Sequence, residues 1–221
     1  MTGRLRTLLE AQGLHLLGGF HPTPDDAVPV AAGTVLVVGN VGSAFYGQLQ
    51  ASPEAKAGDP ADRWTRRIVE EIACEAGAAE VLFPFDGPPF HPFQRWASRA
   101  DPRLWPSPLG LLIHEEHGLW HALRAAILFT EKIELGTIAV PTGSPCASCT
   151  AKPCLSTCPV GAFRQDGYDV NSCRGHLSTL SGQACMLLGC AARRACPVGR
   201  AHAYTPSHAA FHMRAFRAAR R

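Results

Sequence analysis

Apolar residues in the first 130 positions alternate between strand-like runs and helical spacing. Residues 34–40 (TVLVVGN) form a continuous apolar run rich in β-branched side chains, which is typical of a buried strand. Residues 59–78 instead repeat apolar positions at helical spacing, and residues 1–12 predict a shorter amphipathic helix. The inward positions of that first helix are Leu5, Leu8 and Leu9. The pattern therefore predicts a sheet covered by helices.

The same alternation continues to residue 129. Residues 80–85 and 109–113 read as short strands, and residues 92–100 read as a helix. A polar turn is expected over residues 114–118, followed by a second apolar segment over residues 119–129. Strands and helices mixed in this way indicate an α+β or α/β domain, and we expect the α+β class.

The organisation changes near residue 141. Beyond this point the chain has few aliphatic residues for its length and reads as loops and short helices around cysteines. We therefore expect two domains. Residues 1–140 are expected to form a sheet domain, and residues 141–221 a small cysteine-rich domain with a basic C-terminal tail.

Eight of the nine cysteines lie within 51 residues, in two runs. The first run has the spacing Cys-x2-Cys-x4-Cys-x3-Cys-Pro. The second has an isolated cysteine followed by Cys-x4-Cys-x5-Cys-Pro, and both runs close on Cys-Pro-Val-Gly. The eight residues are Cys146, Cys149, Cys154, Cys158, Cys173, Cys185, Cys190 and Cys196.

This order resembles that of bacterial two-cluster ferredoxins. Those proteins use two runs of the form C-x2-C-x2-C-x3-C-P, and the last cysteine of each run ligates the other cluster. This chain lengthens three of the gaps but keeps the order and the closing proline, which fixes φ and turns the chain away. Eight thiolates suit two 4Fe–4S clusters. The crossover rule groups Cys146, Cys149, Cys154 and Cys196 on one cluster, and Cys158, Cys173, Cys185 and Cys190 on the other.

Zinc and disulfides are the alternatives to iron and sulfide. Two zinc ions with four thiolates each would also use eight cysteines. A disulfide framework is less expected, because 221 residues are enough for a hydrophobic core and the N-terminus has no secretory signal pattern. The uneven runs closing on Cys-Pro favour iron–sulfur. The ninth cysteine, Cys74, lies inside a predicted helix, and we expect it to be a buried structural residue.

Composition narrows the remaining function classes. Hydrophobic residues make up 46% of the chain and charged residues 18%, as in globular proteins. No apolar stretch approaches the ~20 residues of a membrane span, so a cytoplasmic protein is expected. The net charge of +3 is small, and we expect no nucleic-acid partner. The basic tail is either a solvated helix end or a docking surface for an acidic electron donor. Its arginines are Arg214, Arg217, Arg220 and Arg221.

Residues 107–128 (SPLGLLIHEEHGLWHALRAAIL) carry a resemblance to cobalamin proteins. A similar strand–turn–strand precedes the ferredoxin-type double-cluster module of epoxyqueuosine reductases and reductive dehalogenases. The animal cobalamin-processing dealkylase/decyanase has a similar stretch without clusters. The resemblance covers roughly residues 34–199. The matching positions are Leu112, Ile113, Gly118, Trp120, Ala122 and Arg124.

The resemblance implies a nitroreductase-like N-terminal domain that binds cobalamin and a cluster domain that supplies electrons to the cobalt. The N-terminal part is shorter than in epoxyqueuosine reductases and has no counterpart of their catalytic acid motif. Corrinoid reduction, dealkylation or decyanation, or reductive chemistry on a small substrate, is therefore expected rather than epoxyqueuosine reduction. The implied cofactors are two 4Fe–4S clusters and cobalamin. The implied partners are a corrinoid and an electron donor of the flavodoxin or ferredoxin reductase type.

The candidate corrinoid contacts come from the helix around residue 96 and from the turn. They are Trp96, Ile113, His114, His117, Gly118, Trp120 and His121. Each also has an ordinary interpretation, because tryptophans usually belong to a core and histidines in turns are usually plain polar residues. The competing function is a ferredoxin-type electron-transfer protein or subunit without a corrinoid site.

Overall fold

The computed structural model describes residues 2–140, 142–164 and 167–219. The chain divides into two compact units. The sheet unit comprises Met1–Arg103 and His121–Pro141, and the cysteine unit comprises Leu104–Trp120 and Thr142–Arg221. The sequence predicts one division after residue 140, whereas the structure groups residues 104–120 with the cysteine-rich segment.

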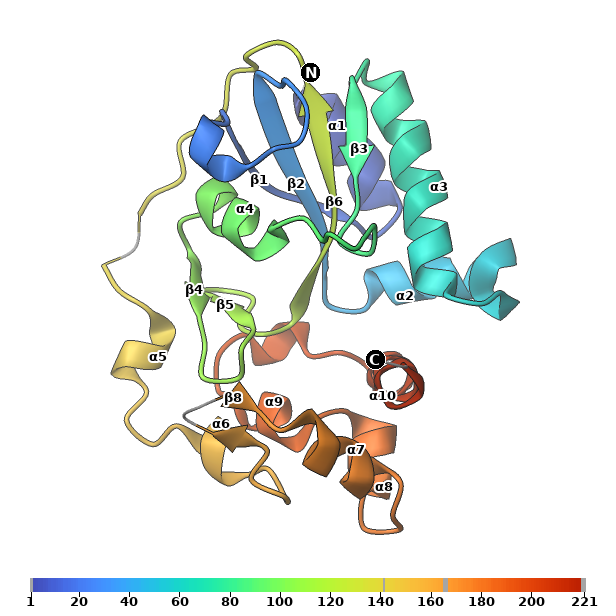
Figure 1. The fold of residues 1–221 in the computed structure, drawn as a ribbon, viewed down its shortest axis with the longest axis vertical. Helices are drawn as coiled ribbons and strands as arrows, with labels where there is room; N and C mark the ends of the chain where they lie inside the picture. Colours follow the sequence, from blue (N-terminus) through green and yellow to red (C-terminus); the bar gives the residue numbers. More distant parts are fainter. Residues whose placement is uncertain (1, 141, 165–166, 220–221) are drawn as a thin grey trace. The chain divides into compact units, whose positions relative to one another are not determined.

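A four-stranded antiparallel sheet forms the centre of the sheet unit. Its strands are β1 (His15–Phe20), β2 (Thr34–Val41), β6 (His121–Phe129) and β3 (Glu80–Leu82), in the order β1-β2-β6-β3 (Figure 1). Every residue of β2 is buried, which explains its continuous apolar sequence. The mixture of helices with an antiparallel sheet is the expected α+β class.

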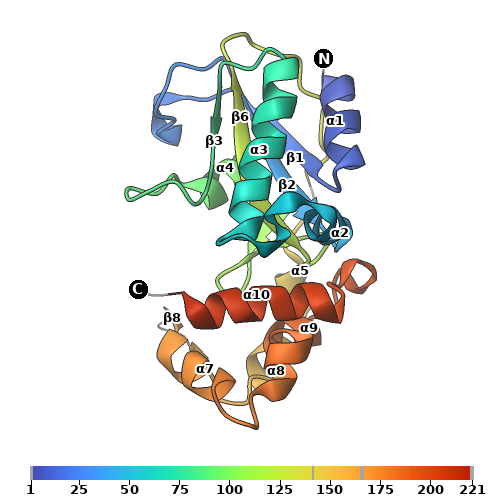
Figure 2. The ribbon, with the colours of Figure 1, turned by 90° about the vertical axis from the view of Figure 1, so that its right-hand side faces the viewer.

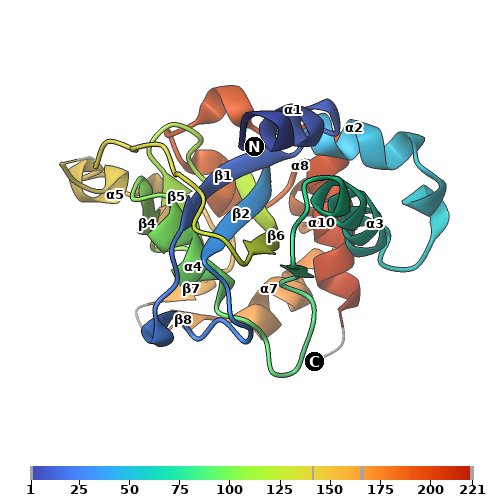
Figure 3. The same cartoon turned by 90° about the horizontal axis from the view of Figure 1, so that it is seen from above.

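Helices cover both faces of this sheet (Figure 3). α1 (Thr2–Ala11), α2 (Ala44–Ala51) and α3 (Pro60–Glu75) lie together, while α4 (Phe93–Ala100) packs on β1 and β2 from the other side. Two 3-10 helices, η1 (Pro24–Asp26) and η2 (Pro53–Lys56), complete the connections. The expected helices are confirmed. The apolar positions Trp64, Ile68, Ile72 and Ala73 of α3 are all buried.

Three strand predictions differ from the structure. β1 was not predicted, because Gly18 and Gly19 weaken its strand pattern and a register shift interrupts its pairing with β2. β3 ends at Leu82 rather than residue 85, shortly before Pro84, which cannot donate to a ladder. The predicted strand at 109–113 begins only at Leu112, because a turn closed by the Gly110 N–H to Ser107 O bond precedes it.

The prediction for Cys74 is wrong. This residue lies near the end of α3 with an exposed side chain, whereas its neighbours Ile72 and Ala73 are buried. The helix places Cys74 on the opposite face, because each residue turns the helix by about 100°. Its thiol is therefore separate from the eight clustered cysteines.

The cysteine unit consists of short elements. A hairpin of β4 (Leu104–Pro106) and β5 (Leu112–His114) precedes the small helices, and β7 (Phe163–Arg164) pairs with β8 (Gly167–Tyr168). The helices are α5 (Pro145–Ser148), α6 (Pro153–Ser156), α7 (Val170–Leu177), α8 (Gln183–Leu188), α9 (Ala191–Ala195), η3 (Arg200–His202) and α10 (Pro206–Ala218). α10 lies across α7 and α8 (Figure 2). In the basic tail, Arg214 and Arg217 lie on α10, while Arg220 and Arg221 lie outside the described residues.

Among the described residues, no helix combines the length and the apolar character needed to cross a bilayer.

Candidate functional site: two groups of cysteine thiols

The clustered cysteines lie on or beside short helices. Cys146, Cys154, Cys173 and Cys185 are on α5, α6, α7 and α8 respectively. The other four lie at helix ends or in loops, with Cys190 and Cys196 directly flanking α9. Ser144 caps α5 by accepting a hydrogen bond from the Cys146 N–H. Short helices with frequent turns let a chain of about 50 residues present eight sulfur atoms inward.

The thiols fall into two neighbourhoods. Burial raises the pKa of Cys146, and the nearby thiolates of Cys196, Cys154 and Cys149 raise it further. Burial likewise raises the pKa of Cys154, followed by the charges of Cys196 and Cys149. Cys196 therefore lies with the first run, although 38 residues separate it from Cys158, the last cysteine of that run.

The second neighbourhood contains the remaining four thiols. Burial raises the pKa of Cys173, and Cys158 and Cys185 add to the shift, while a hydrogen bond with Tyr168 opposes it. Burial also raises the pKa of Cys190, and Cys173 and Cys185 contribute. These mutual influences define two neighbourhoods of four thiols with the same members as the crossover rule names, and metal binding by each neighbourhood stays a prediction.

The sulfurs of each set are not gathered as closely as the four ligands of a single ion would be. A zinc ion bound tetrahedrally at about 2.3 Å from each sulfur requires sulfurs about 3.8 Å apart. Among the described residues, which include all nine cysteines, no three thiols lie within 4.8 Å of one another. Wider spacing is what a multi-iron cluster needs, since each sulfur binds a different iron.

Backbone and apolar groups surround the sulfurs. The Ala162 N–H donates a hydrogen bond to Cys158 Sγ at 3.4 Å. Cys146, Cys154, Cys158 and Cys190 pack against a core of Leu109, Ile113, Leu119, Ala192 and Cys196. A cavity of about 430 Å³ adjoins the second set, whose four cysteines line it together with apolar residues of β8 and α10.

The turn after β5 and the residues flanking it hold most of the candidate corrinoid contacts, and this segment is well packed. His114 is 3% exposed, and its Nδ1 accepts hydrogen bonds from the N–H groups of Glu116 and His117. Gly118 has φ +58°, and a Cβ there would lie 2.1 Å from Val198 O. Ile113 is 1% exposed. The turn is thus fastened to the chain that follows Cys196.

Trp120 has a distinctive environment at the end of this turn. Its ring packs against Tyr204, and the Arg193 guanidinium lies over both rings at 4.8 and 4.4 Å from their centroids. Arg193 also donates to Leu119 O. The indole Nε1 of Trp120 is buried without a hydrogen-bond partner among the described residues. It is a donor that a ligand could satisfy.

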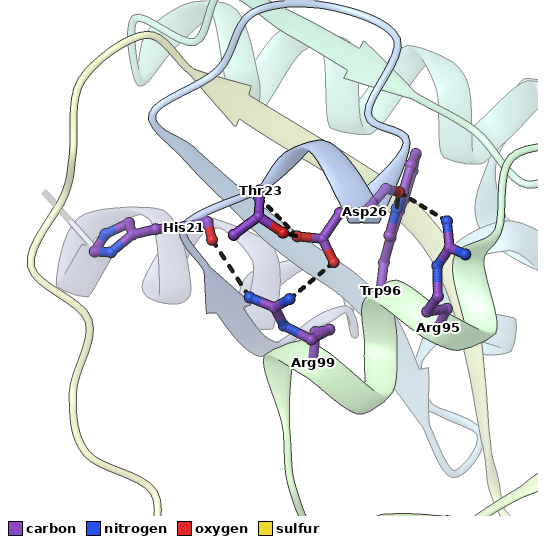
Figure 4. Close-up of polar contacts among 6 residues, drawn as sticks. All are labelled: His21, Thr23, Asp26, Arg95, Trp96 and Arg99. Carbon is purple, nitrogen blue, oxygen red and sulfur yellow. Dashed lines mark hydrogen bonds and ion pairs between the residues drawn. The ribbon is translucent and has the colours of Figure 1, made fainter.

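The other two candidates belong to the sheet unit. His121 is half-buried at the start of β6. Trp96 on α4 has no exposed surface, and its Nε1 donates to the Asp26 backbone oxygen at 2.8 Å (Figure 4). Arg99 binds the Asp26 carboxylate and Arg95 binds its backbone oxygen, so Trp96 is part of a structural network that holds η1.

Three residues that contact the site were not identified from the sequence. Arg193 donates a hydrogen bond to Leu119 O beside the turn, and Tyr168 is hydrogen-bonded to Cys173 of the second thiol set. His202 contacts His117. The Arg193–Leu119 contact and the His202–His117 contact each join residues more than 70 positions apart. No spacing rule links them, because they are neighbours only in the folded unit.

No protein-family model matches this chain, and neither does any curated protein sequence. Solved structures do match. An epoxyqueuosine reductase with an epoxyqueuosine-modified tRNA-Tyr stem loop has a TM-score of 0.55 at 15% identity, covering 93% of this chain and 67% of that one. The enzyme from Streptococcus thermophilus gives 0.52 at 13% identity, covering 90% and 66%. The enzyme from Bacillus subtilis gives 0.50 at 16% identity, covering 84% and 53%.

The chain shares its fold with epoxyqueuosine reductases. The likeness supports that part of the resemblance seen in the sequence, and this chain spans between about half and two thirds of the length of those proteins. At identities of 13–16% the comparison concerns the fold alone.

Proposed function

We propose that this protein is an iron–sulfur oxidoreductase whose cysteine unit holds two 4Fe–4S clusters. The observation that carries the proposal is the division of eight thiols into two sets of four. Cys146, Cys149, Cys154 and Cys196 would hold one cluster, and Cys158, Cys173, Cys185 and Cys190 the other. Such clusters supply one-electron transfer at potentials that the protein tunes by burial and hydrogen bonds.

The chain's own residues provide that tuning. Burial is the largest cause of the raised pKa at four of the thiols, so the sulfurs lie in a poorly solvated environment. The Ala162 N–H donates a hydrogen bond to Cys158 Sγ. Tyr168 stacks on Phe163 with centroids 4.8 Å apart and lines the cavity beside the second set. Burial, followed by the bond to Cys173, also raises the pKa of the Tyr168 hydroxyl, which therefore stays protonated as a donor.

Iron and sulfide content tests this part directly. We expect the anaerobic protein to contain about eight iron and eight sulfide per chain, as two four-iron clusters require. Cys196→Ser and Cys173→Ser should each lower the iron content by disturbing one cluster. Cys74→Ser is the matched control, since its thiol is exposed and outside both sets. Stoichiometric zinc bound by these sulfurs would overturn the proposal.

The second part of the proposal is a corrinoid that receives the electrons. The strand–turn–strand resemblance supports it, and so does the fold shared with epoxyqueuosine reductases. Trp120 offers a buried indole N–H that a ligand could use. The fit of the other candidates is poorer, because Trp96, Ile113, His114 and Gly118 are buried in protein contacts. The nitroreductase-like character of the sheet unit belongs to the same proposal.

Cobalamin binding is tested by absorption spectroscopy. We expect the anaerobic protein to shift the spectrum of hydroxocobalamin toward a form without its lower axial base. Trp120→Phe should weaken the shift and leave the iron content unchanged. Cys196→Ser should abolish reduction of the bound cobalt while preserving the shift. If hydroxocobalamin, methylcobalamin and cyanocobalamin all keep their free spectra, the corrinoid part fails and the cluster part stands.

A specific observation favours the competing function, an electron-transfer protein without a corrinoid. Five of the seven candidate contacts are buried, and only His117 and His121 are half-buried.

In either case the electron donor is proposed to be of the flavodoxin or ferredoxin reductase type. The tRNA stem loop belongs to the similar structure, and the small net charge of this chain still predicts no nucleic-acid partner. A mobility-shift assay with that stem loop tests the prediction.

A further inference from the structure

Two histidines of the cysteine unit lie side by side although 85 residues separate them. His117 belongs to the turn after β5, and His202 ends η3. His117 Nδ1 lies 3.4 Å from His202 Nε2, and the rings meet nearly at right angles. A carboxylate oxygen of Glu116 and one ring nitrogen of each histidine all lie within 4.8 Å of one another. Among the described residues, no other three histidine, cysteine, aspartate or glutamate side chains bring their ligand atoms this close together.

The separation of the two nitrogens fits a shared metal ion. A zinc ion bound tetrahedrally by imidazole at about 2.0–2.1 Å requires nitrogens about 3.4 Å apart. The observed 3.4 Å is longer than the roughly 2.7–3.2 Å of a typical hydrogen bond from N–H. The rings meet edge to face with centroids 4.8 Å apart, so they are not stacked on each other.

The backbone fixes the turn that carries Glu116 and His117. The His114 N–H donates to Gly118 O at 2.8 Å, and the Gly118 N–H donates back to His114 O at 2.9 Å. The N–H groups of Glu116 and His117 both donate to His114 Nδ1. Four hydrogen bonds thus hold the two ligand residues within one tight turn.

The backbone also fixes the partner segment. The His202 N–H donates to Gly199 O at 2.9 Å. A Cβ at Gly199 would lie 2.2 Å from the backbone carbon of His117, so the two backbones touch at a position where only glycine fits. The His117–His202 pairing therefore follows from backbone packing and does not depend on the conformations of long side chains.

We infer that Glu116, His117 and His202 bind one divalent transition-metal ion of the zinc type. Two imidazoles with one carboxylate are a ligand set used for zinc, with a fourth position left for water, and also for iron(II). Calcium and magnesium prefer oxygen ligands alone, so they are not expected here. The ion would join the turn after β5 to the segment that follows Cys196. It would also occupy His117, which removes that residue from the candidate corrinoid contacts.

The test is zinc binding by the anaerobic, iron-loaded protein, followed by zinc X-ray absorption. We expect one zinc per chain with nitrogen and oxygen ligands at about 2.0–2.1 Å and no sulfur ligand at about 2.3 Å. His202→Ala and His117→Ala should abolish binding. Glu116→Gln, a change at an exposed side chain, should weaken it at least tenfold. Glu115→Gln is the matched control, because Glu115 is the adjacent exposed carboxylate outside the group.

A further variant keeps the test informative if the alanine variants fold poorly. His202→Cys should retain zinc and introduce a single sulfur ligand into its absorption spectrum. Zinc held only by sulfur would belong to the cysteine sets and would contradict the inference. So would the absence of bound zinc, or nitrogen-bound zinc that survives both His117→Ala and His202→Ala. Iron analysis of the same samples reports separately on the proposed clusters.

Discussion

At the scale of single residues, burial raises the pKa of several cysteine thiols, whereas hydrogen bonding lowers the pKa of one glutamate. Burial raises the pKa of Cys146, Cys154, Cys173 and Cys190 in the cysteine unit. In the sheet unit, Arg67 binds both carboxylate oxygens of Glu54, with Nε–Oε1 at 2.6 Å. That hydrogen bonding lowers the pKa of Glu54 from 4.5 to about 2. The ionisation of Glu54 is therefore coupled to folding in the acid range.

Glu54→Gln should therefore remove an acid-sensitive contribution to stability. The pKa of Glu54 is lower in the folded protein, so its contribution is complete above about pH 5 and is lost as the pH falls toward 2. We expect the variant to melt below the wild type at pH 7, and the two melting temperatures to converge on acidification. Glu70→Gln is the control, because the single contact of Glu70 with Arg66 is 3.4 Å long and exposed. A melting difference that is constant with pH would contradict the assignment.

Residue types and spacing predict the thiol sets but not the contacts around them. The closing Cys-Pro of each run and the crossover rule place Cys196 with the first run. Nothing in the sequence links His202 to His117 or Arg193 to Trp120, since only the folded unit brings these pairs together. For Cys74 the sequence predicts burial and the structure shows an exposed side chain. A position inside a helix does not by itself tell which face of the helix the residue is on.

At the scale of elements, glycines set how closely the turn after β5 approaches its neighbour. Gly118 and Gly110 both have positive φ, +58° and +71°. Only Gly118 also faces a backbone, with Val198 O at 2.1 Å from the position of a Cβ, whereas nothing lies within 4 Å at Gly110. Substitutions at Gly110 and Gly118 therefore distinguish the cost of the left-handed conformation from the cost of a steric clash.

Gly118→Ala should destabilise the cysteine unit more than Gly110→Ala does. The left-handed conformation costs roughly 1–2 kcal/mol for a residue with a Cβ, which is the whole effect expected at Gly110. At Gly118 the methyl group also forces the turn away from Val198, so the loss should be clearly larger. Anaerobic thermal unfolding of both variants measures the difference. Equal melting temperatures would mean that moving the turn after β5 away from Val198 costs no stability.

The predicted elements were most accurate where periodicity was long. The helix at 59–78 and the strand at 34–40 were recovered nearly in full, because their apolar faces are long and unbroken. β1 contains two glycines and the hairpin before the turn is three residues per strand, so neither gives a strong period-2 signal.

At the scale of the whole molecule, the chain leaves the sheet unit and returns to it. Residues 104–120 lie between α4 and β6 in sequence, yet they belong to the cysteine unit. Their apolar residues Leu109, Ile113 and Leu119 form a core with Ala192 and Cys196. Composition could place a boundary near residue 141, where aliphatic residues become sparse. It could not reveal that an earlier apolar hairpin packs with the cysteines.

Removing the proposed clusters should therefore loosen two separate stretches of the chain. Small metal domains gain much of their folding free energy from ligation, and the hairpin core depends on the cysteine-bearing segment beside it. On chelation or air exposure, we expect residues 104–120 to lose protection together with residues 142–219. Hydrogen exchange followed by mass spectrometry measures this. The His114 and Gly118 amides, which close the turn, should exchange much faster, while β2 amides in the sheet unit keep their protection. Matching Cys74→Ser samples control for oxidation of the exposed thiol. Loss of protection confined to residues beyond 141, with residues 104–120 still protected, would show that the hairpin folds with the sheet unit instead.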